Sequence, residues 1–326
     1  MIDPASDSIG FGVVGANSFV ANAAVLPAIA EARNAHLVAT ASRSGVVPED
    51  WASTDVGSYE AVIEHSDVDA VYIPLPNGMH REWTERAAAA GKHILCEKPL
   101  AADAATARAM ATACSEAGVF LAEAWMTPFH RRYRHVLEMV ERGDIGEIER
   151  IAAAFTFAIA PEAAHNYRWD PTQGGGALLD VGIYCLGAVV QLFGADPDEV
   201  TASQTVTDRG VDASTSAELR WADGRSASIT CSFVDDEAQT LRIEGSTGVA
   251  TLDTEAFTGG PDDRDIGLDT DDGQHSVRIA DANDSYRSMV EAFADAVSGG
   301  PEWPHPVERS IEMLSLIERI RDVATT

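Results

Sequence analysis

Three residues of this sequence have side chains that could bind and move a proton at one site. Lys98 lies in the stretch Cys96-Glu97-Lys98-Pro99-Leu100 and is one of only two lysines in 326 residues. Asp180 and Tyr184 are four positions apart, which places both on one face of a helix. A carboxylate and a phenol on an otherwise apolar face need polar partners. A lysine from another part of the chain would satisfy the carboxylate, and the phenol would then border the same pocket.

Each of these features also has a plainer interpretation. Lys98 could be a solvated lysine in a loop between a strand and a helix. Asp180 could cap a loop while Tyr184 packs in the core. We favour the functional interpretation because lysine is so scarce in this chain that its position carries information.

The residues around Lys98 predict how it is positioned. Gly91 is expected to end a helix, and the apolar run that follows it predicts a buried strand. Asp103 is expected to cap the next helix, over residues 104–117. Lys98 therefore lies at the carboxyl end of a strand, the edge where open α/β sheets bind ligands, and Pro99 excludes helix at the lysine.

The first 124 residues predict one doubly wound parallel sheet, because strands and helices alternate along them. The other expected strands are Ile9–Val14, His36–Ala41, Asp69–Ile73 and Val119–Ala124. Asn77 is expected to cap the helix after the third of these strands. For His80, in the first turn of that helix, we favour a structural role over a catalytic one.

The first strand runs into Gly15-Ala16-Asn17-Ser18-Phe19-Val20, the position of a dinucleotide-binding turn. Only Gly15 of the three fingerprint glycines is present, so the turn alone is a weak signal. The second strand ends in Ser42-Arg43-Ser44 with no acidic residue before Glu49. An acid there binds the ribose of NAD, whereas a cation and open space suit the 2′-phosphate of NADP. Arg43 could also be an ordinary solvated arginine.

From residue 125 onward the pattern predicts a second domain, over 125–326. A helix with Tyr133 and Val136 on its apolar face should stop at Gly143. Strand-like segments joined by turns follow, and they predict a mainly antiparallel sheet flanked by helices. These segments are 148–159, 200–207, 213–221, 226–233, 240–245, 248–253 and 275–279, with further helices over 285–297 and 307–323.

The composition is strongly acidic, with 52 acidic against 23 basic residues and a formal net charge of −29. Such a charge argues against nucleic acid or an anionic membrane as a partner. It suits multimolar intracellular salt, where charges are screened within about 3 Å at 1 M. The densest acidic run, Asp262 to Asp272, lacks EF-hand spacing, so we expect a solvated loop there and no metal site.

Other features indicate a soluble cytoplasmic protein. No uninterrupted apolar run approaches a membrane span, and the first residues do not form a signal peptide. The four cysteines are far apart and are expected to be reduced and buried.

Four motifs together resemble the glucose-fructose oxidoreductase and inositol dehydrogenase (Gfo/Idh/MocA) family. They are the dinucleotide turn, Pro76-Asn77-x-x-His80, Glu97-Lys98-Pro99 and Gly175-Gly176-Ala177-Leu178-Leu179-Asp180-Val181-Gly182-x-Tyr184. Within that family the chain is most similar to NADP-dependent aldose and dihydrodiol dehydrogenases, especially D-xylose 1-dehydrogenases of halophilic archaea. The segments that carry this likeness are Ser42-Arg43, Glu123-Ala-Trp-Met126 with Phe129-His130, and Asn166-Tyr-Arg-Trp-Asp-Pro171.

The resemblance implies a Rossmann domain, an open-faced C-terminal sheet that often mediates dimers or tetramers, and a catalytic group of Lys98, Asp180 and Tyr184. On the same basis we expect NADP to contact Gly15, Asn17, Ser18, Phe19, Ser42, Arg43, Leu75, Asn77, His80, Glu97, Lys98 and Arg168. We expect the sugar to contact Trp125, Asn166, Trp169, Asp180 and Tyr184.

The expected reaction is oxidation of an aldose at C1 to the aldonolactone by hydride transfer to NADP⁺. A free tyrosine has a pKa of about 10, so a tyrosine base needs a cation such as Lys98 beside it, with Asp180 orienting the ammonium. Lys98 could instead be the base. Two other functions stay open: another polyol, dihydrodiol or keto-sugar oxidoreductase of this family, and a non-catalytic nicotinamide-sensing regulator.

Overall fold

The computed structural model describes residues 8–51, 55–160, 166–258, 264–279 and 284–325. The chain forms two compact units. Unit 1 combines Met1–Met126 with Asp284–Ile311, and unit 2 combines Thr127–Asn283 with Glu312–Thr326. The division after Met126 lies close to the expected one at residue 124, but a segment near the C-terminus belongs to the first unit.

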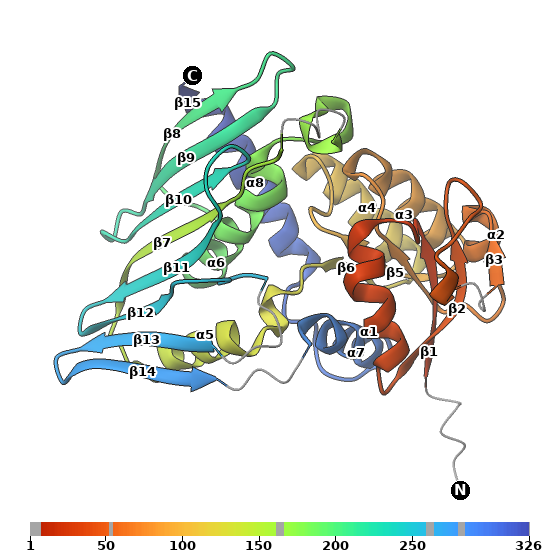
Figure 1. Ribbon diagram of the computed structural model, residues 1–326, viewed down its shortest axis with the longest axis horizontal. Helices are drawn as coiled ribbons and strands as arrows, with labels where there is room; N and C mark the ends of the chain where they lie inside the picture. The colour runs from red at the N-terminus through yellow and green to blue at the C-terminus, as the bar shows by residue number, and fades with distance from the viewer. Residues whose placement is uncertain (1–7, 52–54, 161–165, 259–263, 280–283, 326) are drawn as a thin grey trace, which may run out of the picture. The chain divides into compact units, whose positions relative to one another are not determined.

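Unit 1 contains a six-stranded, all-parallel sheet with the strand order β3-β2-β1-β4-β5-β6 (Figure 1). The strands are β1 Ile9–Val14, β2 Ala35–Ala41, β3 Asp55–Gly57, β4 Ala70–Ile73, β5 His93–Glu97 and β6 Leu121–Ala124. The order reverses at β1, as in a doubly wound fold, so the predicted fold class of this half is confirmed. β3 and the following helix α2, Tyr59–Glu64, were not predicted because both are short.

The other helices of unit 1 are α1 Leu26–Glu31, which continues a π-turn over Ala21–Val25, α3 His80–Ala89, α4 Ala104–Ala117 and α7 Ser285–Val297. Among them, side-chain caps begin α4 and α7. Asp103 accepts a hydrogen bond from the backbone N–H of Thr106, and Gly118 closes α4 in a left-handed conformation. α7 belongs to unit 1 because it packs on α1 and also reaches β1, where the rings of Phe293 and Phe11 are 5.6 Å apart.

Unit 2 contains a nine-stranded sheet with the order β14-β13-β12-β11-β7-β10-β9-β8-β15. The strands are β7 Ile148–Thr156, β8 Glu199–Val206, β9 Asp212–Arg220, β10 Ser226–Ser232, β11 Ala238–Gly245, β12 Gly248–Leu252, β13 Arg264–Thr270, β14 Gly273–Ile279 and β15 Ala324–Thr325. Six of the eight strand pairs are antiparallel, and β7 with β10 and β8 with β15 are parallel, which confirms a mainly antiparallel sheet.

The prediction of a solvated acidic loop before residue 273 was wrong, because β13 pairs with both β12 and β14. Ile266 is buried in this strand while Asp265 is exposed, so the acidic residues occupy one face of a real strand. The first two aspartates of the acidic run lie outside the described residues.

Three helices lie on one face of the unit 2 sheet (Figure 1). They are α5 Arg131–Arg142, α6 Ile183–Phe193 and α8 Val307–Val323, of which α8 begins in unit 1. Gly143 ends α5 in the left-handed conformation, as predicted. The stretch Pro171–Phe193 has the length and mean hydropathy, 1.8, of a membrane span, contrary to expectation; 89% of its apolar window is buried, so it is the core helix of this unit.

Candidate functional site

The turn after β1 approaches the loop after β4 very closely. Gly15 has φ of +109°, and a Cβ there would lie 2.8 Å from the Leu75 side chain. The N–H groups of Gly15 and Ala16 both donate to the Ala41 carbonyl at 2.9 Å, which ties the turn to the end of β2. Glycine is therefore required at the one fingerprint position where it occurs.

Polar groups gather around the turn after β1. The Asn17 side chain donates to the Val46 carbonyl at 2.7 Å, and the Ser42 hydroxyl donates to the same carbonyl at 2.5 Å. The Ser18 hydroxyl accepts a hydrogen bond from the Ala21 N–H. Asn17 thus links the turn to the loop after β2, a bond that glycine at this position could not make.

The exposed side chains beside this turn are those expected to meet the cofactor. Phe19 is 88% exposed, an unusual state for an aromatic ring. Arg43 is exposed as well. Burial raises the pKa of Tyr59, although the nearby charge of Arg43 acts to lower it. A cation with room around it lies at the end of β2, and no acidic side chain follows it directly.

His80 connects the loops that follow β4 and β5. Its Nε2 lies 2.7 Å from the Leu75 carbonyl oxygen, and its Nδ1 lies 3.0 Å from that of Pro99. The ring is fully buried, and burial lowers its pKa. This geometry fits the structural role that we favour.

Asn77 does not cap α3 as predicted. It begins the short 3₁₀ turn Asn77–Met79, and α3 has no side-chain cap.

Lys98 lies at the carboxyl end of β5, as predicted, and the residue before it is a buried carboxyl group. The Tyr72 hydroxyl donates to Glu97 Oε1 at 2.7 Å, and the Lys98 N–H donates to Glu97 Oε2 at 3.1 Å. Burial raises the pKa of Glu97 to about 7, although the bond from Tyr72 and the charge of Lys98 both lower it. Lys98 itself is half-buried.

A second buried carboxylate, Glu123 at the end of β6, holds the far side of this turn. It accepts hydrogen bonds from the Leu100 N–H at 2.8 Å and from the Ser310 hydroxyl at 2.6 Å, and His305 Nε2 lies 3.2 Å away. Burial acts to raise the pKa of Glu123, but these bonds outweigh it, so the pKa is lowered. The turn that carries Lys98 is therefore fixed by Glu97, His80 and Glu123.

In unit 2 the Gly174-Gly175-Gly176 segment holds Arg168 in place. The Gly176 N–H donates to the Arg168 carbonyl at 3.0 Å, and a Cβ on Gly175 would lie 2.5 Å from that oxygen. The Asn166 side chain accepts a hydrogen bond from the Arg168 N–H at 3.1 Å. The glycines allow two stretches of backbone to lie against each other at this point.

Arg168, Asp180 and Tyr184 lie together in unit 2. Arg168 Nε donates to Asp180 Oδ2 at 2.6 Å. Asp180 lies in a π-turn, Leu178–Gly182, that opens α6, where we expected a regular helix. Tyr184 is buried and packs on Phe155, with ring centroids 5.2 Å apart. π-turns inside helices occur often at functional sites.

The two tryptophans expected at the substrate lie in different units. Trp169 is half-buried and packs edge-on against Phe233, with centroids 5.4 Å apart. Trp125 is buried against His305 at 4.7 Å. Its placement in the core of unit 1 favours a structural role, and its contact with the sugar stays a prediction.

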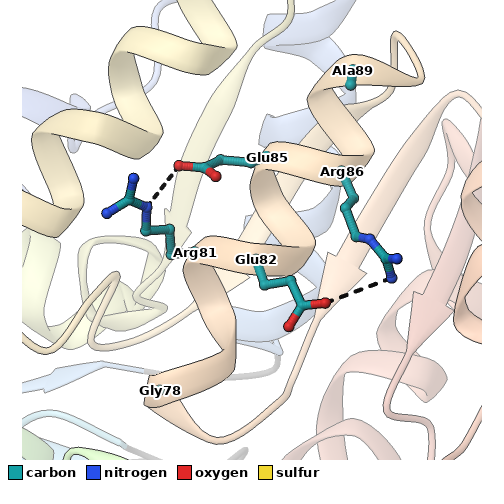
Figure 2. A pocket seen from close by; sticks show the side chains of 6 residues that line it. All are labelled: Gly78, Arg81, Glu82, Glu85, Arg86 and Ala89. Atoms are coloured by element: carbon teal, nitrogen blue, oxygen red, sulfur yellow. Dashed lines mark hydrogen bonds and ion pairs between the residues drawn. The ribbon is translucent and has the colours of Figure 1, made fainter.

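Two further possibilities give no candidate site in the part of the chain that the structure describes. A hollow runs along α3, where Arg81 pairs with Glu85 and Arg86 with Glu82 (Figure 2). These opposite charges neutralise one another, so the hollow has no unmatched charge for a ligand.

Among the described residues, no group of three or more His, Cys, Asp or Glu side chains could hold a metal ion. The four cysteines are free and buried, as predicted.

Sequence reasoning missed Tyr72, His305 and Ser310 as supports of the Lys98 turn. They are separated from their partners by 25, 182 and 187 positions. No local pattern marks them, although Glu123 lies within a strand that was predicted.

Comparison with known proteins places both parts of the chain in one family. Residues 9–124 match the model of an oxidoreductase family with an NAD-binding Rossmann fold, and residues 133–251 match that of the GFO/IDH/MocA C-terminal domain. The chain is 37% identical to a D-xylose 1-dehydrogenase (NADP(+)) of Haloferax volcanii over 97% of both chains.

Two solved structures are similar over almost the whole chain. A 3-ketoreductase from Actinomadura kijaniata, in complex with NADP and TDP-benzene, gives a TM-score of 0.89 at 32% identity, covering 97% of this chain and 98% of the other. An aldose-aldose oxidoreductase from Caulobacter crescentus, complexed with glycerol, gives 0.85 at 26% identity, covering 97% of both. The protein therefore belongs to the Gfo/Idh/MocA family of oxidoreductases.

Proposed function

We propose that this protein is an NADP-dependent sugar dehydrogenase that oxidises an aldose, D-xylose or a similar pentose or hexose, at C1. The observation that carries the proposal is the side-chain set of the two units: Lys98 at a strand end of unit 1 and Asp180 with Tyr184 on one helix of unit 2. The Haloferax volcanii relative, named as a D-xylose dehydrogenase that uses NADP(+), supports the substrate class and the cofactor.

The cofactor preference follows from the ends of the first two strands. Gly15 keeps the backbone of the dinucleotide turn close to Leu75, and Arg43 presents its charge beside Ser42 where an acid would select NAD. NADP⁺ supplies the acceptor for the hydride when it is bound. Apart from Arg168, which belongs to unit 2, the residues expected to hold it lie in or next to the loops after β1, β2, β4 and β5, at the carboxyl edge of one parallel sheet.

In the proposed mechanism the C1–H bond of the cyclic sugar breaks and its electron pair leaves with the hydrogen as hydride. The O1–H proton passes to Tyr184 as the C1–O1 double bond of the lactone forms. Lys98 stabilises the phenolate that must precede this transfer, and Asp180 orients the lysine ammonium. If Lys98 is itself the base, the same atoms move and Tyr184 only positions O1.

The decisive experiment is a panel of pentoses and hexoses with NADP⁺ in molar KCl, monitored by the absorbance of reduced nicotinamide. We expect D-xylose or a close relative to give the highest kcat/KM. The alternative oxidoreductase function predicts turnover of polyols or dihydrodiols, or reduction of a keto sugar with NADPH, and no aldose oxidation. The similarity to the Actinomadura kijaniata 3-ketoreductase supports reduction of a keto sugar as the alternative reaction.

The regulator alternative predicts NADP binding without turnover of any substrate. We give it less weight because Lys98 and Tyr184, which a sensing protein does not need, are both present.

We also propose that the protein works in the cytoplasm as a homo-oligomer assembled through the unit 2 sheet. The sheet face opposite the buried one presents small polar side chains, including Thr201, Ser203, Ser216, Ser228 and Thr230. A flat face of this kind suits pairing with a second copy. Light scattering of the unaltered protein and of a Ser216→Arg, Thr230→Arg variant tests this, since the variant should be monomeric.

A further inference from the structure

The Asp180 carboxylate has a cationic partner inside its own unit. Arg168 Nε donates to Asp180 Oδ2 at 2.6 Å, and the side chains are 27% and 5% exposed. A carboxylate so deeply buried is ionised only if a cation and hydrogen bonds compensate for the lost hydration. Arg168 provides both in one contact, and a guanidinium keeps its charge at every pH at which the protein is folded.

The backbone around Arg168 is built so that the side chain cannot easily leave this position. Its N–H donates to the Asn166 side chain and its carbonyl accepts from the Gly176 N–H. A Cβ on Gly175 would lie 2.5 Å from the same carbonyl oxygen, so the two stretches of backbone are in close contact. The guanidinium carbon lies 4.8 Å from the centre of the Tyr167 ring, so the charge also rests on an aromatic face.

Tyr184 lies within electrostatic reach of the same guanidinium. Burial lowers the pKa of Arg168, but the charges of Asp180, Tyr167 and Tyr184 outweigh it and raise the pKa. The rings packed against Tyr184 are those of Phe155 and Phe257, neither of which titrates. Arg168 and Asp180 are therefore charges of unit 2 that act on the Tyr184 phenol.

We propose that Arg168 is a positioning residue of the proton-transfer site: it keeps Asp180 ionised and fixed, and it adds a permanent positive charge beside Tyr184. This inference rests on the proposed role of Tyr184 as the base. It differs from the cofactor contact first expected for Arg168, because the side chain is anchored on Asp180. It also makes Asp180 unsuitable as a general base, since its carboxylate is already bound by the Arg168 guanidinium.

The test compares Arg168→Met, which removes the charge, with Arg168→Lys, which keeps it. The matched control is Arg150→Met, which removes an exposed arginine of the same unit that pairs with Glu244. The readout is the pH dependence of kcat with saturating NADP⁺ and sugar in molar KCl. A neighbouring cation lowers the pKa of an acid by about 1–3 units. Arg168→Met should therefore move the rising limb of the kcat profile to higher pH by about one pH unit or more.

Arg168→Lys should restore most of the original profile, and Arg150→Met should leave it unchanged. The KM for NADP⁺ should change less than about threefold in all three variants, since none loses a cofactor contact. The inference is overturned if Arg168→Met lowers kcat with no shift of the limb. It is also overturned if the loss falls on the KM for NADP⁺, which would make Arg168 a cofactor ligand.

A second readout needs no turnover and therefore separates this inference from the proposed function. Ultraviolet difference titration of the unaltered protein against its Tyr184→Phe variant isolates the ionisation of Tyr184. The same two titrations are then made with proteins that also carry Arg168→Met, in which the Tyr184 ionisation should lie at higher pH. An unchanged titration contradicts the inference even if sugar oxidation is observed, and a shifted one supports it even if the substrate is a different compound.

Discussion

The Tyr72 hydroxyl of β4 donates a hydrogen bond of 2.7 Å to Oε1 of Glu97, which ends β5, the strand that presents Lys98; both side chains are buried. An acidic group in this position is hard to ionise, and burial raises the pKa of Glu97 to about 7. The residue next to the predicted catalytic lysine therefore changes charge near neutral pH.

This relationship predicts a pH-dependent stability that Glu97→Gln removes. The folded pKa lies above the unfolded one, so the stabilisation by neutral Glu97 is complete below pH 4.5 and is lost as the pH rises through about 7. Relative to Glu97→Gln, the unfolding free energy of the unaltered protein should fall by up to about 3 kcal/mol between pH 5 and pH 8. Denaturant unfolding at both pH values measures it. The exposed control Glu116→Gln should keep the pH dependence of the unaltered protein. If the unfolding free energies of the unaltered protein and of Glu97→Gln change with pH in the same way, the prediction is contradicted.

Removing Glu123 should loosen the turn that carries Lys98. Glu123→Ala leaves the Leu100 N–H and the Ser310 hydroxyl without their carboxylate. Breaking a buried charged network of this kind costs about 3–5 kcal/mol, so the melting temperature should fall clearly. The surface control Glu116→Ala should have little effect. A Glu123→Ala protein as stable as the unaltered one would show that the network does not support the turn.

Arg43 should set the choice between NADP⁺ and NAD⁺. A charge-assisted phosphate contact contributes about 1.5–3 kcal/mol, so Arg43→Asp should lower the ratio of kcat/KM for the two cofactors at least about tenfold. Arg43→Lys keeps the charge and should retain most of the preference. Equal use of both cofactors by the unaltered protein would refute this assignment.

The parts of the fold that follow local rules could be predicted from the sequence. α4 has the predicted bounds because Asp103 and Gly118 supply its caps. β13 was missed because its acidic residues hid the alternation around Ile266. The Glu123–His305 contact joins residues 182 positions apart, and only the tertiary packing of the C-terminal segment brings them together. Arg168 and Asp180 were both predicted as site residues. Their pairing was not predicted, because it depends on the π-helical turn and on the glycine segment.

The net charge of −29 should make the protein dependent on salt. Screening of the mutual repulsion by KCl should raise both the melting temperature and the activity up to the molar range. A titration from 50 mM to molar KCl, with sucrose at matched osmolality as control, measures this. Full activity and unchanged melting in low salt would contradict adaptation to a saline cytoplasm.

The central claim is that Lys98 and Tyr184 act as one unit on the substrate hydroxyl, and a double-mutant cycle on kcat tests it most directly. Lys98→Met and Tyr184→Phe should each lower kcat by about 10²–10⁴ with little change in NADP⁺ binding, the usual contribution of general-base catalysis. Lys92→Met and Tyr133→Phe are the matched controls. Lys92 donates to backbone carbonyls, and Tyr133 bonds to Gln191, so both should affect stability rather than kcat.

The account predicts that the Lys98→Met, Tyr184→Phe double variant loses far less than the product of the two single losses, because groups that share one proton transfer are not additive. Asp180→Asn should cost less than either single change, since Asp180 orients the lysine and does not itself take the proton. Fully multiplicative losses, or near-normal turnover by Tyr184→Phe, would contradict a shared proton transfer.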